Sequence, residues 1–452
     1  MSESRTDKLP LTAELARRAI AYRTARLEDD VLTVAKLCLL DWTAVALAAI
    51  DEPVSTLVRR EFSESSRGKV TGIGSGNGFS AADAALVNGT TSHALDYDDV
   101  HPLIGHPSVP ILPAVLAVAE EMGSSGADTL RAFVAGYDAA AFVGSIVMPS
   151  HYDRGFHSTA TLGSFGAAVG AGLLLGLDEQ QMRMALGLAG TQAAGLKSMF
   201  GSMAKPFHAG RAAANGVIAA RLARSGFTAN ADVIETEQGF AATQSAFETA
   251  SPRQAEFQAG RVKQTLFKYH AACYLTHSTI EALKRLREEH SLQPADIEDV
   301  EVHVARGHLK VCNIEIPKTG LELKFSIAQL AAAALAGIDT AAIGSYSDGT
   351  ATDPVLCALR GHVRVHGDRR PGTAAEVMVR TRRGTTYEAS TDTGVPETDL
   401  RRQEHNLRRK FHSLVDPVIG ADRAENLRAQ IEGLERAPNI SAMTAHWRVT
   451  LH

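Results

Sequence analysis

The chain has 452 residues, of which 45% are hydrophobic and 21% charged. This length and this balance exclude a disordered chain and predict a globular protein of two or three domains. The formal net charge of −5 gives no reason to expect nucleic acid as a partner.

Neither the amino-terminal residues nor the cysteines indicate a membrane protein or a secreted one. The amino-terminal residues, MSESRTDKLP, lack the apolar core of a secretory signal, and no run of about 18 uninterrupted apolar residues predicts a membrane span. The four cysteines are widely separated, without a Cys-x-x-Cys pair. This spacing is typical of a reducing compartment and argues against structural zinc and iron–sulfur clusters. We therefore expect a cytoplasmic protein.

The first 260 residues have the apolar periodicity of packed helices. Helices are predicted over residues 11–26, 30–50, 109–122, 127–148, 158–176, 178–194 and 205–225. The helix over 30–50 is apolar on nearly all sides and is therefore expected in the core. Ser80 with Asp83, and Asp178 with Gln181, have the spacing of capping boxes that begin helices.

The pattern changes in the middle of the chain. Residues 299–305 alternate as a strand does, and residues 362–366 and 374–390 follow the same pattern, with a hairpin turn predicted at Arg383-Gly384. A helix at about 325–337 lies between them. Helices return from about residue 398 and are expected to pack on the first domain. The fold class is thus mainly α with a smaller α+β domain.

Residues 88–108 are the stretch richest in groups that can carry out chemistry. Six titratable side chains lie there: His93, Asp96, Asp98, Asp99, His101 and His106. Pro102 and Pro107 make a continued helix unfavourable, so these groups lie where a packed helix passes into a loop. Such a position on a rigid support is typical of catalytic groups.

Three further stretches hold cationic and imidazole side chains. They contain Arg154 and His157; Lys205 and His208; and Lys268, His270, Cys273 and His277. Pro206 suits the first turn of a helix, which places Lys205 at a helix end that favours anions. Acids, imidazoles and amines in one pocket would bind carboxylates and move protons.

Taken together, these segments resemble the MmgE/PrpD family. The resemblance is carried, in chain order, by Asn88-Gly89…His93-Ala-Leu-Asp96-Tyr-Asp98-Asp99…His106-Pro, Lys205-Pro-Phe-His208-x-Gly-x-Ala-Ala, Gly226-Phe227-Thr228, Phe267-Lys268…His277 and Leu323-Lys324-Phe325-Ser326. The family includes 2-methylcitrate dehydratase, cis-aconitate decarboxylase and iminodisuccinate epimerase. The resemblance implies a helical domain built from both chain ends, residues 1–266 and 400–452, and an α+β lid domain, residues 267–399.

The resemblance also implies a homodimer, a small carboxylate substrate, and no metal or organic cofactor in the decarboxylase and epimerase branches. By position, the pocket of the family would comprise Asp96, His106, His157, Lys205 and Lys268. We expect His106, His157, Lys268 and Asp96 to be catalytic: His106 and His157, or one of them with Lys268, carry the protons, and Asp96 orients or tunes its neighbours. The expected substrate-binding residues are Lys205, His208, His93, Cys273 and Arg154.

Two positions depart from the decarboxylase pattern. Val100 stands where that branch has threonine, and Cys273 stands where it has histidine. These departures favour epimerisation of a substituted succinate such as iminodisuccinate, by proton removal next to a carboxylate. Dehydration of a citrate-type hydroxy acid and decarboxylation of cis-aconitate stay open as alternatives.

Two other classes of protein remain as remote alternatives. A metal-dependent hydrolase would use His93, Asp96, Asp99 and His101 as ligands, although no His-x-x-x-His pair is present. A non-enzymatic helical binding protein would hold a ligand without turnover.

Overall fold

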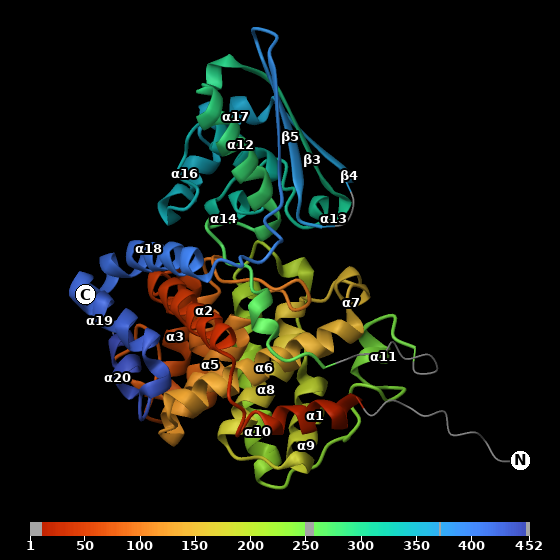
Figure 1. Ribbon diagram of the computed structural model, residues 1–452, viewed down its shortest axis with the longest axis vertical. Helices are drawn as coiled ribbons and strands as arrows, with labels where there is room; N and C mark the ends of the chain where they lie inside the picture. The colour runs from red at the N-terminus through yellow and green to blue at the C-terminus, as the bar shows by residue number, and fades with distance from the viewer. Residues whose placement is uncertain (1–10, 249–256, 370–371, 449–452) are drawn as a thin grey trace, which may run out of the picture.

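The computed structural model describes residues 11–248, 257–369 and 372–448. Within them the chain forms a large helical part and a smaller α+β part above it (Figure 1). We call these the body (residues 11–271 and 400–448) and the lid (residues 272–399), because each has a hydrophobic core of its own. The predicted fold class is confirmed.

The body is built mainly of helices from both ends of the chain (Figure 1). They are α1 (Leu11–Ala21), α2 (Asp29–Ala48), α3 (Pro53–Ser65), α4 (Ala81–Ser92), α5 (Ser108–Met122), α6 (Gly126–Val147), α7 (Ser150–Asp153), α8 (Ser158–Leu174), α9 (Glu179–Gln192), α10 (Ala204–Arg224), α11 (Phe240–Gln244), α18 (Leu400–Ile419), α19 (Ala421–Glu432) and α20 (Ser441–Thr444). Two short strands, β1 (Val70–Thr71) and β2 (Gly78–Phe79), pair with each other. Trp447 packs edge-on against Trp42 of α2, with ring centroids 5.6 Å apart, so both chain ends share one core.

The lid combines a four-stranded sheet with short helices. Its elements are α12 (His277–His290), β3 (Ile297–Ala305), α13 (Arg306–Leu309), α14 (Gly320–Leu323), α15 (Ile327–Leu335), α16 (Asp348–Ala351), α17 (Pro354–Arg360), β4 (Val363–Arg369), β5 (Ala375–Thr381) and β6 (Thr386–Thr391). The strand order is β4-β3-β5-β6, parallel between β3 and β4 and antiparallel elsewhere. Alternate valines such as Val300 and Val302 are buried on the face that α12 and α15 cover.

Several of these elements begin or turn at the capping and hairpin signals predicted from the sequence. Asp178 and Gln181 form both hydrogen bonds of a capping box at the start of α9. At α4 the Ser80 hydroxyl accepts from the Asp83 backbone N–H, which makes Ser80 the N-cap. The predicted hairpin at Arg383-Gly384 joins β5 to β6, and Gly384 adopts the positive φ of 83° that such a turn needs.

Helices α4 and α10 approach each other closely enough to require glycine. A Cβ atom added at Gly89 would lie 2.8 Å from the Gly210 Cα atom. A Cβ atom added at Gly210 would overlap with the Leu86 carbonyl oxygen and the Thr90 hydroxyl. Because α4 leads into the loop of residues 93–107 and α10 carries Lys205, this contact sets the spacing between two parts of the predicted site.

In the part of the chain that the structure describes, two helices are long and apolar enough to cross a membrane, α2 and α6. In α2, 78% of the apolar 18-residue window is buried inside the protein, and in α6 the buried share is 89%. The sequence predicted no such span because neither stretch is an uninterrupted apolar run. Their burial matches that of core helices.

The predicted domain boundaries, after residues 266 and 399, stay our proposal for how the chain divides. Phe267 and Ala271 still pack in the core of the body, whereas Ala272 begins the core of the lid. The segment around Lys268 therefore crosses from one part to the other.

Candidate active site

The loop after α4 places Asp96 at the centre of the candidate site. His93 caps the end of α4, and Asp96 follows with a φ of 53°, in the left-handed region that few residues other than glycine adopt. Asp96 is 4% exposed. Strained backbone of this kind at a buried acid is typical of sites where a side chain must hold one orientation.

A single oxygen of Asp96 meets three cationic or basic groups. Asp96 Oδ1 lies 2.8 Å from Lys205 Nζ, 3.0 Å from Lys268 Nζ and 3.4 Å from His106 Nε2. The other oxygen, Oδ2, is buried and has no hydrogen-bond partner among the described residues. A buried carboxylate oxygen left in this way can accept from a bound ligand.

The two lysines hold Asp96 differently. Lys268 is fully buried, and its ammonium group donates to Asp96 Oδ1, to the Asp96 backbone oxygen at 2.6 Å and to the Ala272 backbone oxygen at 3.1 Å. These three acceptors use all three of its protons. In this arrangement Lys268 orients Asp96 and does not offer a proton to a substrate.

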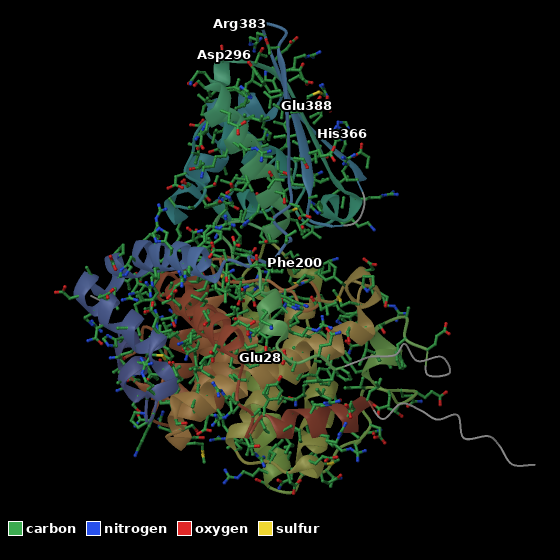
Figure 2. All side chains as sticks on the ribbon, viewed as in Figure 1. Glu28, Phe200, Asp296, His366, Arg383 and Glu388 are labelled. Carbon is green, nitrogen blue, oxygen red and sulfur yellow. The ribbon has the colours of Figure 1, made fainter. Side chains whose placement is uncertain are left out.

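Lys205 keeps hydrogen-bonding capacity for a ligand. Its only acceptor among the described residues is Asp96, so two of its three protons have no protein partner. The ammonium group lies 5.2 Å from the ring centroids of Phe200, from the body, and Phe325, from the lid. Figure 2 shows Phe200 where the two parts meet. Lys205 therefore belongs to a pocket wall shared by body and lid.

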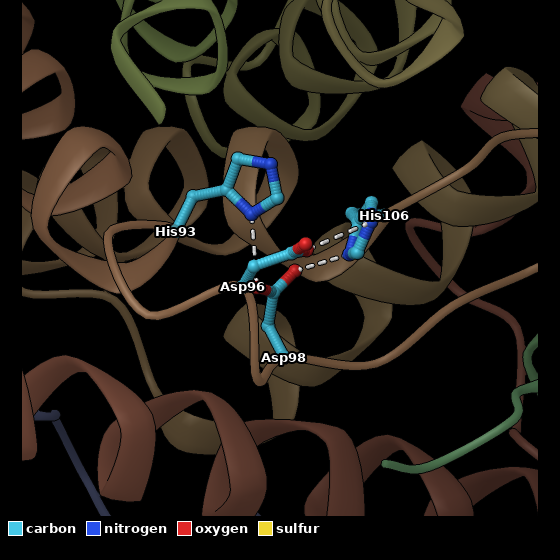
Figure 3. A group of neighbouring side chains, drawn as sticks. All are labelled: His93, Asp96, Asp98 and His106. Atoms are coloured by element: carbon cyan, nitrogen blue, oxygen red, sulfur yellow. Dashed lines mark hydrogen bonds and ion pairs between the residues drawn. The ribbon is translucent and has the colours of Figure 1, made fainter. Parts of the chain in front are cut away.

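Asp98 connects two imidazoles. Its oxygens lie 2.9 Å from His93 Nδ1 and 2.8 Å from His106 Nδ1, as Figure 3 shows. With both Nδ1 atoms facing Asp98, the Nε2 atoms point elsewhere: that of His106 lies 3.4 Å from Asp96 Oδ1, and that of His93 is buried without a partner among the described residues. A carboxylate that fixes the tautomer and orientation of an imidazole is the arrangement used in general-base catalysis.

The charges of the cluster depend on each other. Burial opposes the ionisation of Asp96, but the ammonium groups of Lys205 and Lys268 outweigh it and hold the pKa of this carboxyl well below its usual range. The imidazoles of His93 and His106 similarly outweigh burial and keep the pKa of Asp98 low. Both carboxylates are therefore ionised at neutral pH.

Burial acts in the opposite sense on the imidazoles. It lowers the pKa of His106 to about 4, although the Asp98 carboxylate favours the charged form. Burial, assisted by the Lys205 ammonium group, also lowers the pKa of His157 well below its usual value. Both rings are neutral at pH 7, and a neutral ring can accept a proton.

A second pair of imidazoles lies beside this network. His157, which caps the start of α8, has its Nδ1 atom 3.1 Å from the Nδ1 atom of His208 on α10. The ring of His157 stacks at a centroid distance of 6.1 Å from that of His93, which lies 4.6 Å from His106. The structure thus brings two of the predicted imidazole rings, His106 and His157, next to His93, with His208 behind His157.

Two of the predicted residues are less directly placed. Cys273 is buried, and the charges of Asp96, Lys268 and Lys205 all influence its thiol. A hydrogen bond from Cys312 lowers the pKa of this thiol. Arg154 is exposed at the end of α7 and does not join the cluster, so its binding role stays a prediction.

Sequence reasoning left out four residues that surround the predicted ones. Asp98 lies among the titratable groups of residues 88–108, but neither the spacing nor the resemblance gives it a role. Lys324 and Phe325 belong to the Leu-Lys-Phe-Ser segment, and Phe200 carried no signal. Lys324 is buried and donates to the Leu95 backbone oxygen at 2.5 Å, and burial lowers its pKa to about 8.

The predicted metal-ligand set is not brought together. Asp99 accepts from the Ser108 hydroxyl at 2.6 Å, and the His101 ring accepts from the Leu103 backbone N–H and packs on Tyr137. Both side chains anchor the loop. Sequence spacing alone could not show that these residues turn away from His93 and Asp96.

A different group could hold a cation by distance alone. One ligand atom from each of four residues lies within 4.8 Å of the others: His93, Asp96, Asp98 and His106. The Nδ1 atoms of both rings already face Asp98, and Asp96 Oδ1 meets two ammonium groups that would repel a divalent cation. This donor set fits a proton-transfer network better than a metal centre.

A large cavity in the described part of the chain lies elsewhere. It has a volume of about 1180 Å³ between body and lid and is lined by residues that include Tyr97, His270, His277 and Lys410. None of the five residues expected from the family lines it. We place the site at the Asp96 cluster because it contains two ionised carboxylates, buried polar atoms without a partner among the described residues, and the strained backbone of Asp96.

Comparisons with known proteins agree across most of the chain. The MmgE/PrpD N-terminal domain model matches residues 13–252, and the MmgE/PrpD C-terminal domain model matches residues 270–436. A cis-aconitate decarboxylase of Aspergillus terreus is 32% identical over 304 residues, which are 63% of this chain and 61% of that protein. The match thus spans less than two thirds of that relative.

Two other relatives align over more of their length. The cis-aconitate decarboxylase-like protein oryM of Aspergillus oryzae is 27% identical over 477 residues, which are 97% of this chain and 98% of that protein. The cis-aconitate decarboxylase of Homo sapiens is 27% identical over 384 residues, which are 80% of this chain and 78% of that protein.

Proposed function

Because the chain belongs to the MmgE/PrpD family, we propose that it is an enzyme that removes a proton next to a carboxylate of a small di- or tricarboxylate, with its own acid and base groups. The observation that carries this proposal is the arrangement around Asp96 Oδ1, where two ammonium groups and a neutral imidazole converge. Such a site combines anion binding with a proton acceptor.

Substrate binding is assigned to Lys205. Its two free protons would donate to a substrate carboxylate, while Lys268 keeps Asp96 in place. Lys205 and Lys268 contact Asp96, and Lys324 lies nearby on the Leu95 backbone oxygen; against the ionised Asp96 and Asp98, these three lysines leave a surplus of one positive charge. An anionic substrate therefore improves the charge balance.

Proton removal is assigned to His106 Nε2. Asp98 accepts the Nδ1 proton of His106, which leaves the lone pair at Nε2 free to take the substrate proton. The electron pair of the broken C–H bond then moves toward the adjacent carboxylate to give an enolate-type state. The Lys205 ammonium group stabilises this charge, and one such donor contributes on the order of 10²- to 10³-fold to kcat.

Proton return distinguishes the candidate reactions. We propose epimerisation of a substituted succinate such as iminodisuccinate, in which the imidazolium form of His157, linked to His208, gives a proton to the opposite face of the same carbon and becomes neutral, while His106 becomes protonated; proton exchange with solvent then restores both rings. Cys273, buried in the same electrostatic neighbourhood, supports this reading because a histidine stands there in the decarboxylase pattern. Decarboxylation of cis-aconitate is the second candidate, and the names of the relatives favour it.

A substrate panel in deuterated water tests the proposal. The purified enzyme is incubated with single stereoisomers of iminodisuccinate, with cis-aconitate and with 2-methylcitrate, and products are followed by proton NMR. Deuterium incorporation with interconversion of stereoisomers supports epimerisation, whereas release of CO₂ or water assigns the decarboxylase or dehydratase reaction.

Matched variants link the turnover to the site. His106→Asn should abolish exchange, because asparagine cannot accept the proton, while His405→Asn changes an exposed histidine of α18 and should leave turnover intact. Turnover that survives in His106→Asn would remove His106 from the mechanism. A lack of turnover with every member of the panel would contradict the proposed substrate class.

A further inference from the structure

The sheet of the lid has one polar face. Alternate residues of β3 and β4 that do not enter the core include Glu301 and His303 on β3, and Arg364, His366 and Asp368 on β4. The parallel register sets His303 directly beside His366. The helices α12 and α15 pack on the other face, which leaves these side chains half exposed to solvent.

Three side chains on this face lie close enough to share one ligand. One ring nitrogen each of His303 and His366 and one carboxylate oxygen of Glu301 lie within 4.8 Å of one another. The two rings stack with centroids 4.7 Å apart and an interplanar angle of 19°. Figure 2 shows His366 on the lid, far from the interface with the body where Phe200 lies.

Each imidazole is already directed by a carboxylate. His366 Nε2 pairs with Glu301 Oε2, and His303 Nδ1 lies 2.9 Å from Asp368 Oδ2. A carboxylate on the ring nitrogen that does not bind the ion, as Asp368 can be for His303, raises the basicity of a ligating ring and fixes its orientation. Asp368 can therefore act either as a fourth ligand or as the group that orients His303.

We propose that Glu301, His303 and His366 form a site for a divalent transition-metal ion of the zinc class, which joins β3 to β4. Two imidazoles and a carboxylate suit Zn²⁺, Ni²⁺ or Cu²⁺ and are poor ligands for Mg²⁺ or Ca²⁺. Three protein ligands leave a coordination position for water or for Asp368. The candidate ligand atoms lie within 4.8 Å of one another, and side-chain rotations would draw them to the closer spacing of ligands held at about 2.0–2.2 Å from one ion.

The neighbouring arginine does not prevent binding. Arg364 pairs with Asp299 and with Glu301 Oε1, so it occupies the oxygen of Glu301 that faces away from His366. The side chains of Glu301, His303 and His366 are 16%, 32% and 40% exposed, which gives an ion a path from solvent. None of these residues belongs to the Asp96 cluster, so the metal site and the proposed reaction are independent.

Metal binding would stabilise the lid. An ion that binds only the folded sheet lowers the equilibrium constant of unfolding by the factor 1 + [metal]/Kd, about 100-fold at a free-metal concentration of 100 times Kd. The ion would join β3 to β4, which are parallel neighbours in the sheet but lie about sixty residues apart in the sequence. It would therefore strengthen a contact between distant segments of the chain.

Calorimetric titration of the chelator-treated protein with Zn²⁺ tests the proposal. We expect one ion per chain in the wild type, a Kd at least 10-fold weaker in His303→Ala and in His366→Ala, and a 10- to 100-fold weaker Kd in Asp368→Asn. His405→Ala, which changes an exposed histidine on α18, should bind as the wild type does. Thermal melts of each variant in chelator confirm that folding is unchanged.

Two results would overturn the proposal. One is a wild-type protein that binds no Zn²⁺, or that binds several Zn²⁺ ions weakly and still binds them in the double variant His303→Ala/His366→Ala. The other is uptake that is lost in His106→Asn and kept in His303→Ala, because the ion would then occupy the Asp96 cluster. The spectrum of bound Co²⁺ in these variants distinguishes the two sites independently of any enzymatic activity.

Discussion

At the scale of single residues, the two lysines that contact Asp96 have different surroundings, so their substitution should affect activity and stability differently. Lys205→Met removes a group with free protons, and we expect kcat/KM to fall about 10²- to 10³-fold with a smaller change in stability. Lys268→Met removes a fully satisfied buried cation, and we expect the free energy of unfolding to fall by about 3–5 kcal/mol.

Urea unfolding and steady-state kinetics on both variants separate these effects. Lys284→Met, at an exposed position of α12, is the matched control and should change neither quantity. Equal loss of stability in the two active-site variants would show that Lys205 is also structural.

The pH dependence of kcat/KM should report two of these groups in the free enzyme. His106, with its pKa lowered to about 4 by burial, must be neutral to accept a proton, so activity should rise as pH increases through about 4. Lys324, with its pKa lowered to about 8 by burial, loses its charge above that pH, so activity should fall through about 8. Lys324→Arg keeps the charge and should move the alkaline limb to higher pH. An alkaline limb that stays in place would assign it to another group.

Residue roles in the loop after α4 could be predicted only in part. The run Asp96-Tyr97-Asp98-Asp99 marks the region, and the family resemblance selects Asp96. The direction of each neighbour depends on the left-handed φ of Asp96, which breaks any helical or strand periodicity. Because of this, Asp98 faces two imidazoles while Asp99 turns to Ser108, which the spacing does not show.

At the scale of elements, the glycine contact between α4 and α10 controls the position of the site. Gly210→Ala would push its Cβ atom into the Leu86 carbonyl and the Thr90 hydroxyl of α4, and we expect a loss of about 1–3 kcal/mol in the free energy of unfolding. Gly307→Ala in α13, where an added Cβ meets nothing within 4 Å, should be neutral or stabilising. Denaturant unfolding of both variants measures the difference. A Gly210→Ala protein as stable as the wild type would show that the helices can separate freely.

Element bounds follow well from local chemistry. The capping box at Asp178 and the hairpin at Arg383-Gly384 depend on neighbours in sequence, so the sequence alone predicts them. The predicted helix over 11–26 ends at Ala21 instead, although its apolar pattern continues. Such ends depend on the packing of α1 against other helices, and that information is not local.

At the scale of the whole molecule, a buried ion pair joins helix α18, from the C-terminal part of the chain, to α2 in the N-terminal part. Lys410 Nζ lies 2.7 Å from Asp41 Oδ1 of α2 and donates to the backbone oxygens of Tyr97 and Lys268. Lys410→Met leaves a buried carboxylate unpaired, and we expect a loss of about 3–5 kcal/mol in the free energy of unfolding.

A double-mutant cycle tests this pair. Asp41→Asn in the Lys410→Met background removes the uncompensated charge and should restore part of the stability. Losses that simply add in the double variant would show that the two side chains do not interact. Neither partner could be paired from sequence, because 368 residues separate them in the chain and many other Asp and Lys residues compete.

The enclosure of Lys205 between two aromatic rings, with Asp96 as its built-in counterion, affects which metabolites the protein can select. Because Lys268 fixes Asp96 in place, an incoming acid has to share the Lys205 ammonium group with that carboxylate. A monoacid such as acetate or lactate offers one group to this shared cation and gains little from it. A molecule with two or three carboxylates can place one group on the free protons of Lys205 and engage the remaining positive field with another, so selectivity would follow the valence of the acid before its shape.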